Sequence, residues 1–296
     1  MSLKPDILCV GSVLWDVIGR SDGNMSTGDD VKGQIFRQPG GVALNLAIRL
    51  RKYKILSEIL SAVGNDSEGR DLLEFLNTEG IICQNIFKSK ISKTDVYMAI
   101  EVENEVISAI ADTQLLEAEA SKILANLLAG PYGEWNTPIV LDSNLPNRVL
   151  TSIRHSQKFL KSEFMLVPAS PSKVDRLRVF LDHPGSIFYL NLREANSLVK
   201  SDFKFVEDAG KAVLELGAKS TLITNGPQKA CYMCGETIIT ATPPEVRVRK
   251  LTGAGDVLMA AHIASQFLAK DPYDSLMFSI NEASEYISEE FNYATN

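Results

Sequence analysis

The segment LTGAGD, Leu251–Asp256, is the part of the sequence best suited to chemistry. Apolar residues in the following VLMAAHIASQFLAK recur at helical spacing, so we expect a helix that begins at or just after the glycines. Glycines let the backbone turn tightly and let a ligand approach the main chain. The amides of Gly253, Ala254, Gly255 and Asp256 would then converge at a helix N-terminus, where they could stabilise a transferring phosphoryl group.

The carboxylate of Asp256 is a candidate general base, because at this position it could accept the proton of an attacking hydroxyl group. The alternative is that Asp256 only caps the helix, and local spacing leaves both readings open. Two familiar phosphate motifs are absent. The chain has no G-x-x-x-x-G-K-[ST], which excludes a P-loop enzyme, and GAGDVL does not fit the dinucleotide motif G-x-G-x-x-G.

A second segment, QPGGVALNLAIRL, places Gly40 and Gly41 before a predicted helix whose apolar first turns carry one polar side chain, Asn45. An amide there offers both a donor and an acceptor to vicinal hydroxyl groups. The alternative is a purely structural asparagine.

A third segment, NLREAN, follows the apolar strand candidate IFYL. Asn191 and Glu194 lie one helical turn apart at the carboxyl end of that strand, a position that suits Mg²⁺ held largely through water. Glu194 could instead serve only the first turn of a helix.

Short apolar runs alternate with longer amphipathic stretches along the chain. This pattern predicts an α/β fold with a mostly parallel sheet and helices on both faces. The expected strands are Ile7–Gly11, Ile55–Val63, Ile139–Asp142, Phe164–Val167, Ile187–Leu190 and Thr221–Thr224. The expected helices are Gly41–Lys52, Glu68–Glu79, Glu117–Leu128, Arg148–Leu160 and Phe203–Leu216.

Two regions depart from this alternation. Thr94–Val102 and Glu105–Ala111 are rich in β-forming residues, and Val13–Ile35 is also compatible with strands. We expect these stretches, about 13–35 and 92–112, to form a small antiparallel sheet that covers a site at the carboxyl edge of the main strands. The whole chain, 1–296, is then expected to be one domain with an inserted lid.

The composition limits the partners. With 30 basic and 37 acidic residues the net charge is −7, which disfavours a nucleic-acid polymer but leaves a small anion open, because backbone amides can bind one. No apolar run is long enough for a signal peptide or a membrane span. The C-x-x-C at Cys231 and Cys234 lacks further metal ligands nearby and lies in a β-like stretch, which favours a structural role. We therefore expect a soluble cytoplasmic protein.

Taken together, the motifs resemble those of the ribokinase-like, or phosphofructokinase-B type, carbohydrate kinases. They are VGS-x-x-x-D (Val10–Asp16), PGG-x-x-x-N (Pro39–Asn45), VGNDSEG (Val63–Gly69), N-x-x-E (Asn191–Glu194), ITNGP (Ile223–Pro227) and TGAGD (Thr252–Asp256). The resemblance implies a ribokinase-like three-layer α/β/α sandwich with a β lid. It also implies a phosphotransferase that uses ATP and Mg²⁺ to phosphorylate a hydroxymethyl group of a sugar or nucleoside.

The resemblance implies a role for each matching residue. Asp256 matches the catalytic base, and Gly253, Ala254 and Gly255 match the anion hole. The positions that match ribose contacts are Asp16, Gly40, Gly41 and Asn45. The positions that match nucleotide contacts are Asn191, Asn225, Gly226, Thr252 and Asn281, with Asn191 and Glu194 also matching the magnesium motif.

Within the family, the segments Val96–Thr113 and Val167–Leu177 are most similar to the pseudouridine-kinase branch. That similarity makes the 5′-hydroxyl of pseudouridine the expected acceptor and adds Ser12, Thr94, Asp112 and Lys173 as candidates on the substrate side. The alternatives are another sugar or nucleoside kinase of the family, or a nucleoside-binding protein without catalysis.

Leu251 stands where the family's usual DTGAGD begins with Asp, a change that could alter monovalent-cation handling. K⁺ is a further cofactor expectation from the family. A homodimer through the lid hairpin is the expected assembly, although an exposed strand edge can also belong to a monomer.

Overall fold

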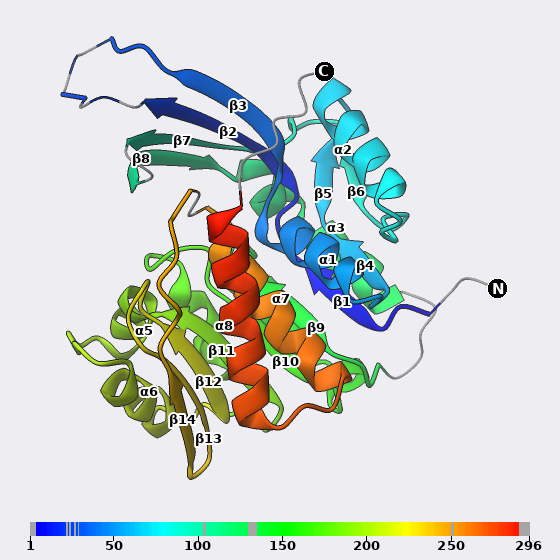
Figure 1. Ribbon diagram of the computed structural model, residues 1–296. Helices are drawn as coiled ribbons and strands as arrows, with labels where there is room; N and C mark the ends of the chain where they lie inside the picture. Colours follow the sequence, from blue (N-terminus) through cyan, green and yellow to red (C-terminus); the bar gives the residue numbers. More distant parts are fainter. Residues whose placement is uncertain are drawn as a thin grey trace.

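The computed structural model describes residues 4–289 except for 22, 24, 27, 29, 103–104, 130–134 and 250–251. Its centre is an eight-stranded sheet (Figure 1). The strands in spatial order are β14 (Thr237–Ala241), β13 (Ala230–Cys234), β12 (Ser220–Thr224), β11 (Ser186–Asn191), β10 (Phe164–Val167), β9 (Ile139–Asp142), β1 (Ile7–Val10) and β4 (Ser57–Leu60). Pairings from β12 to β4 are all parallel, whereas both pairings of β13 are antiparallel.

Helices cover both faces of this sheet because its strands are apolar on both sides. On β1, Leu8 and Cys9 are both buried, and they belong to the cores on opposite faces. The helices of one core are α1 (Val42–Lys52), α2 (Ser67–Thr78), α7 (Ala254–Phe267) and α8 (Pro272–Ser288). The elements of the other are α3 (Gln114–Ala129), α4 (Asn147–Arg154), α5 (Leu192–Val199), α6 (Val206–Glu215) and the 3₁₀ turns η1 (Gln157–Phe159) and η2 (Val174–Phe180). The expected three-layer α/β fold is confirmed.

A second sheet of four strands projects beyond the end of the main sheet (Figure 1). Its order is β3 (Gln34–Gly40), β2 (Leu14–Ser21), β7 (Val96–Val102) and β8 (Glu105–Asp112). This lid sheet confirms the lid expected from 13–35 and 92–112, with β3 continuing to the PGG motif. β2 and β7 run parallel, so the sheet is mixed rather than antiparallel throughout.

Two carboxylates, the partly buried Asp66 and the buried Asp95, fix the base of the lid. Asp66 caps α2 and accepts hydrogen bonds from the Thr94 amide (2.9 Å) and hydroxyl (2.6 Å). Asp95 precedes β7 and accepts from the amides of Leu115 (2.9 Å) and Leu116 (3.0 Å), which follow β8. The β7–β8 hairpin is therefore closed at its base by the side chain of Asp95.

Several boundaries differ from the expected ones. The predicted strand Ile55–Val63 is two strands, because β5 (Ala62–Gly64) leaves the main sheet and pairs with β6 (Phe87–Ser89). The predicted helix Arg148–Leu160 ends at Arg154, since the Ser156 hydroxyl accepts from the Lys158 amide and starts a separate 3₁₀ turn. Within the described ranges, no helix is long and apolar enough to cross a membrane.

Candidate functional site

The glycine loop turns into a helix where the sequence predicted it. Gly253 has a φ of +88° and is followed directly by α7. A Cβ on Gly253 would lie 2.9 Å from the hydroxyl oxygen of Tyr286, which a shift of that side chain can relieve, so glycine is favoured here chiefly by the positive φ. The N-terminus of α7, with its positive end of the helix dipole, opens beside Asp256. Leu251 lies outside the described residues.

Asp256 is held by Asn45, a residue 211 positions away in sequence. The Nδ2 group of Asn45 donates a 2.8 Å hydrogen bond to Oδ2 of Asp256. Burial raises the pKa of Asp256 to about 6, and the Asp142 charge adds to this effect while Asn45 and Arg49 oppose it. The structure thus gives the carboxylate a side-chain partner on α1, whereas the N-cap of α7 is Gly253 and has no side-chain hydrogen bond.

Asp16 faces the same place from lid strand β2. It is buried, and burial together with the charge of Asp256 raises the pKa of Asp16 to about 7. A Cβ on Gly40 would lie 2.2 Å from the Asp16 carboxylate oxygen Oδ2, and a Cβ on Gly41 would lie 2.5 Å from the backbone oxygen of Ser12. The PGG motif therefore brings its backbone against Asp16, a predicted ribose contact, and against Ser12, a substrate-side candidate.

Asn191 and Glu194 form a reciprocal cap at the start of α5. The Asn191 amide donates to Oε2 of Glu194, and the Glu194 amide donates to Oδ1 of Asn191, both at 2.9 Å. This confirms the first-turn role that the sequence left open. The pair also faces the site, because Asn191, Glu194 and Asp256 line one cavity of about 150 Å³.

The environment of Glu194 disfavours the ionised form of its carboxyl group. Burial raises the pKa of Glu194 to about 7, and the charge of Asp256 adds to this effect. Within the described residues, no group of three or more His, Cys, Asp or Glu side chains could hold a metal ion. A cation here would need ligands from elsewhere, such as phosphate oxygens and water, which is the usual arrangement for Mg²⁺.

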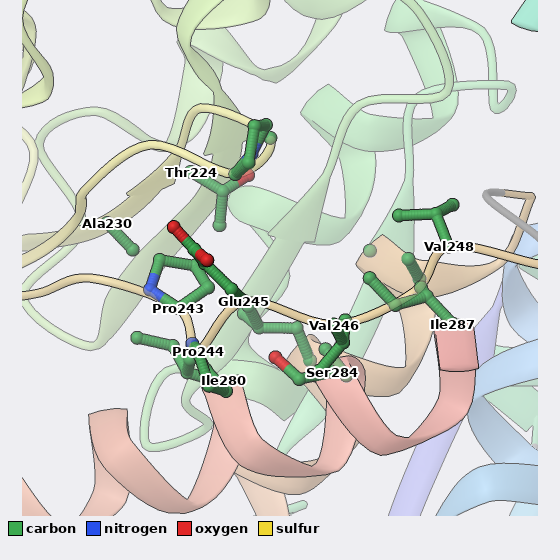
Figure 2. Close-up of a pocket in the computed structure, with 16 residues that line it drawn as sticks. Thr224, Ala230, Pro243, Pro244, Glu245, Val246, Val248, Ile280, Ser284 and Ile287 are labelled. Carbon is green, nitrogen blue, oxygen red and sulfur yellow. The ribbon is translucent and has the colours of Figure 1, made fainter. Parts of the chain in front are cut away.

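A larger pocket of about 700 Å³ adjoins this cavity (Figure 2). The two share Thr224, Gly255 and Leu258. Its remaining walls are largely apolar and come from the segment 243–248 and from α8. Such a shape suits the flat base of a nucleotide, whose phosphates would then point toward the start of α7.

The predicted nucleotide contacts are placed unequally around this pocket. Gly226 lines it, whereas Asn225 lies between the lining residues Thr224 and Gly226 without being one itself. Asn281 is exposed and does not line the pocket. The face of α8 that does so carries Ile280, Ala283, Ser284 and Ile287. The nucleotide contact of Asn281 stays a prediction, and the residues that line the pocket do not support it.

A buried polar network links Ser12 to Lys173. Asp142, at the end of β9, accepts hydrogen bonds from the Ser12 amide (2.9 Å) and hydroxyl (2.5 Å). Asn144 donates to Ser12 and to Asp142, and its Oδ1 accepts a 2.6 Å bond from Nζ of Lys173. Two of the candidate substrate-side residues thus meet through two residues that sequence reasoning missed.

The other two candidates lie at the lid. The Thr94 hydroxyl is buried, donates to Asp66 and accepts a 3.0 Å bond from the Gly64 amide, so it holds the lid base. Asp112 is exposed at the end of edge strand β8, opposite Val96. Their substrate contacts stay predictions.

Sequence signals exist for only one of the missed residues. Asp142 ends the apolar run IVLD on a strand that pairs with β1, so a carboxylate was to be expected beside Ser12. Glu101 and Arg49 have no such signal. Glu101 accepts a 2.6 Å hydrogen bond from the Thr252 hydroxyl, and Arg49 lies over the ring of Tyr286, 4.5 Å from its centroid.

Known proteins are similar to this chain over nearly its whole length. The model of the pfkB family of carbohydrate kinases matches residues 4–290. Pseudouridine kinase of Escherichia coli (strain K12) is 27% identical over 300 residues, covering 98% of this chain and 93% of that protein. A structure of Arabidopsis thaliana ribokinase complexed with ribose and ATP has a TM-score of 0.75 at 19% identity, covering 97% of this chain and 94% of that one.

A further structure, described as a ribokinase II from E. coli in complex with ATP and Mg²⁺, has a TM-score of 0.73 at 18% identity and covers 97% of this chain and 94% of that one. The family match over nearly the whole chain shows a carbohydrate kinase. The chain belongs to the pfkB family, whose members include proteins that bind ATP and Mg²⁺.

One prediction follows from Asp16 alone. Its pKa in the folded protein, about 7, lies above the ordinary value of 3.8, so the folded state holds this proton more tightly than the unfolded chain. Protonated Asp16 therefore adds to the free energy of unfolding. This stabilisation is fully present below pH 4 and is lost as the pH rises toward 7. We expect Asp16→Asn to raise the unfolding midpoint at pH 8 by about 5–10 °C.

Thermal unfolding of the ligand-free protein at pH 4, 6 and 8 checks this. Asp71→Asn, an exposed change on α2, is the matched control and should leave the midpoint nearly unchanged. An unfolding midpoint for Asp16→Asn below that of the wild type at pH 8 would contradict the raised pKa of Asp16.

Proposed function

We propose that this chain transfers the γ-phosphoryl group of ATP to the 5′-hydroxyl group of a ribosyl nucleoside, with pseudouridine as the acceptor. One observation carries the proposal. The Asp256 carboxylate, in the first turn of α7, accepts a hydrogen bond from Asn45 and lines a small cavity that adjoins a pocket of nucleotide size. The choice of pseudouridine is supported by the similarity to pseudouridine kinase over nearly the whole length of both chains.

In the proposed mechanism, Asp256 accepts the proton of the 5′-hydroxyl as its oxygen attacks the γ-phosphorus in line with the departing ADP oxygen. The amides of Gly253, Ala254 and Gly255 stabilise the charge on the transferred group. Asn45 holds the carboxylate toward the acceptor. Most of the rate is then due to positioning and charge stabilisation.

We assign the magnesium contacts to Glu194 and Asn191. Glu194 lies beside Asp256 with a raised pKa, and a divalent cation carried in with the phosphates would relieve that charge stress. Mg²⁺ neutralises the phosphate oxygens when it is bound. K⁺ stays a prediction.

The acceptor side is assigned to Asp16, the backbone at Gly40 and Gly41, and Asn45. These contacts surround the Asp256 carboxylate, and Asp16 arrives from the lid, so closure would complete the ribose site and limit water. The network from Ser12 to Lys173 is placed further along the acceptor, with Thr94 and Asp112 at the lid. Asn225, Gly226 and Thr252 are kept as nucleotide-side residues.

Release of ADP with MgATP and each of pseudouridine, uridine, adenosine, ribose and fructose 6-phosphate tests the proposal. We expect the highest kcat/KM with pseudouridine. A strong preference for ribose would overturn the acceptor while leaving the kinase assignment intact. Binding of ATP without ADP release for any acceptor would instead favour a nucleoside-binding protein.

The pH dependence of this activity is expected to follow Asp256. Its pKa is about 6, and the base must be deprotonated, so kcat/KM should fall about tenfold per pH unit below about 6. Asn45 lowers the pKa of Asp256, so Asn45→Leu should move the acid limb to higher pH. Rates between pH 5 and 9 measure both effects, and an unmoved limb in Asn45→Leu would assign the titration to another group.

We also propose a homodimer through the outer face of the lid. Ile35, Met98, Ile100 and Ile110 are exposed there, with Met98 opposite Ile110 in the sheet. An apolar patch of this kind can stack on its own copy about a twofold axis, with Arg37 and Asp112 on the same face at its margins. Light scattering should show a dimer that Met98→Lys with Ile110→Lys dissociates, and a monomeric wild type would contradict this.

A further inference from the structure

The loop that precedes α7 is held from two sides through Thr252. The Thr252 hydroxyl donates a 2.6 Å hydrogen bond to Oε1 of Glu101 on lid strand β7. The Thr252 carbonyl accepts a 3.0 Å hydrogen bond from the hydroxyl of Tyr286 on α8. Because Thr252 comes directly before Gly253, both bonds act on the backbone that presents the first amides of α7.

Glu101 is fixed within the lid by its other oxygen. Oε2 of Glu101 accepts from Nε (3.1 Å) and Nη2 (2.6 Å) of Arg20, which lies opposite it on β2. The Glu101 residue is only 2% exposed. A carboxylate buried to this degree needs ionic and hydrogen-bonding partners. One of these partners, the Thr252 hydroxyl, lies outside the lid sheet.

The contact on the other side of the loop belongs to the core. Tyr286 packs against Gly253 and carries the guanidinium of Arg49 over its ring. Arg49 lies one helical turn after Asn45 on α1. None of these contacts involves a lid residue. The Thr252–Glu101 bond, in contrast, exists only while the lid is against the loop.

We propose that Glu101 is a positioning residue that links the lid to the loop that precedes α7. Closure of the lid over the acceptor then also fixes the amides that receive the phosphoryl group. The inference rests on the proposed kinase function. Without acceptor the lid is closed for only part of the time, so the bond to Thr252 is formed less often and the loop is on average less well ordered for transfer. ATP hydrolysis in the absence of acceptor is thereby kept slow.

The test uses Thr252→Val, which removes the hydroxyl with little change in shape and keeps the carbonyl for Tyr286. We expect kcat/KM for the acceptor to fall about tenfold, mainly through kcat, because a hydrogen bond to a charged group is lost. The ratio of acceptor-free ATP hydrolysis to transfer should rise. Thr252→Ser keeps a hydroxyl and should restore wild-type behaviour, and Thr78→Val, an exposed change on α2, should leave all rates unchanged.

Glu101→Gln should act in the same direction, and the double variant with Thr252→Val should be no worse than the stronger single variant, since both break one link. Additive effects would overturn the coupling. So would a Thr252→Val protein with wild-type kcat/KM and an unchanged hydrolysis ratio.

Hydrogen exchange of the ligand-free protein gives a readout that needs no turnover. Thr252→Val should speed exchange of amides in β7 and in the first turn of α7, while α6 stays as in the wild type. Unchanged exchange in both segments would overturn the inference. If the wild type phosphorylates no acceptor yet exchange changes as expected, the proposed function fails and the link between lid and loop stands.

Discussion

Asp256→Asn is expected to lower kcat for phosphoryl transfer about a thousandfold while MgATP still binds. Loss of a general base typically costs about 10²–10⁴-fold, and here the same group also orients the attacking hydroxyl. Asparagine has the same shape, and its amide can still pair with Asn45. Steady-state ADP release gives kcat, and calorimetry gives the dissociation constant for the nucleotide.

This variant should fold well, because it removes a charge whose pKa is raised by burial and by the neighbouring Asp142. Asp71→Asn on α2 serves as the charge-matched control. The acid limb of the pH profile should also disappear, since asparagine does not titrate. A folded Asp256→Asn protein with near-normal turnover would refute the base assignment.

Gly41→Ala is expected to have the second-largest effect, on stability and activity together. Gly41 has a φ of +98°, where an alanine is strained, and its Cβ would lie 2.5 Å from the carbonyl oxygen of Ser12. Strain of this kind costs about 1–3 kcal/mol, and the clash with backbone adds to it. The start of α1 must shift, and Asn45 moves with it. We therefore expect the free energy of unfolding to fall by about 3 kcal/mol and kcat by about a hundredfold.

Denaturant unfolding and steady-state rates measure the two effects. Gly19→Ala in β2 is the matched control, because the nearest atom to its Cβ would be a carbonyl oxygen 3.9 Å away. That variant should lose little stability. A Gly41→Ala protein as stable and active as Gly19→Ala would show that the backbone at the PGG motif can relax without moving α1.

Much of the main sheet was predictable because its strands are uninterrupted apolar runs. β9 and β10 have the predicted ends, Ile139–Asp142 and Phe164–Val167. The break between β4 and β5 was not predictable, since both halves are apolar and only pairing with β6 separates them. The mixed strand directions in the lid depend likewise on which strands meet, and no local pattern encodes this.

The candidate site was predictable where one short motif both shapes the backbone and carries the side chain. TGAGD and Asn45 are such cases, and the structure brings them within hydrogen-bonding distance. Glu101 sits on an ordinary lid strand, and Tyr286 on a helix that was not predicted. Their contacts with Thr252 arise only when three distant elements pack together. For Asn281, helical periodicity along α8 would have pointed instead to Ile280 and Ser284.

The Asp95 carboxylate, which joins the two ends of the β7–β8 hairpin through Leu115 and Leu116, has a consequence for how this family diversifies. Because these hydrogen bonds close the hairpin at its base, the segment between them can be replaced as a unit. Residues 96–112 can change in length, turn and surface without disturbing α3, whose start Asp95 continues to cap. An exchanged insert that keeps Glu101 would thus alter the acceptor side while the loop before α7 keeps its bond to the lid.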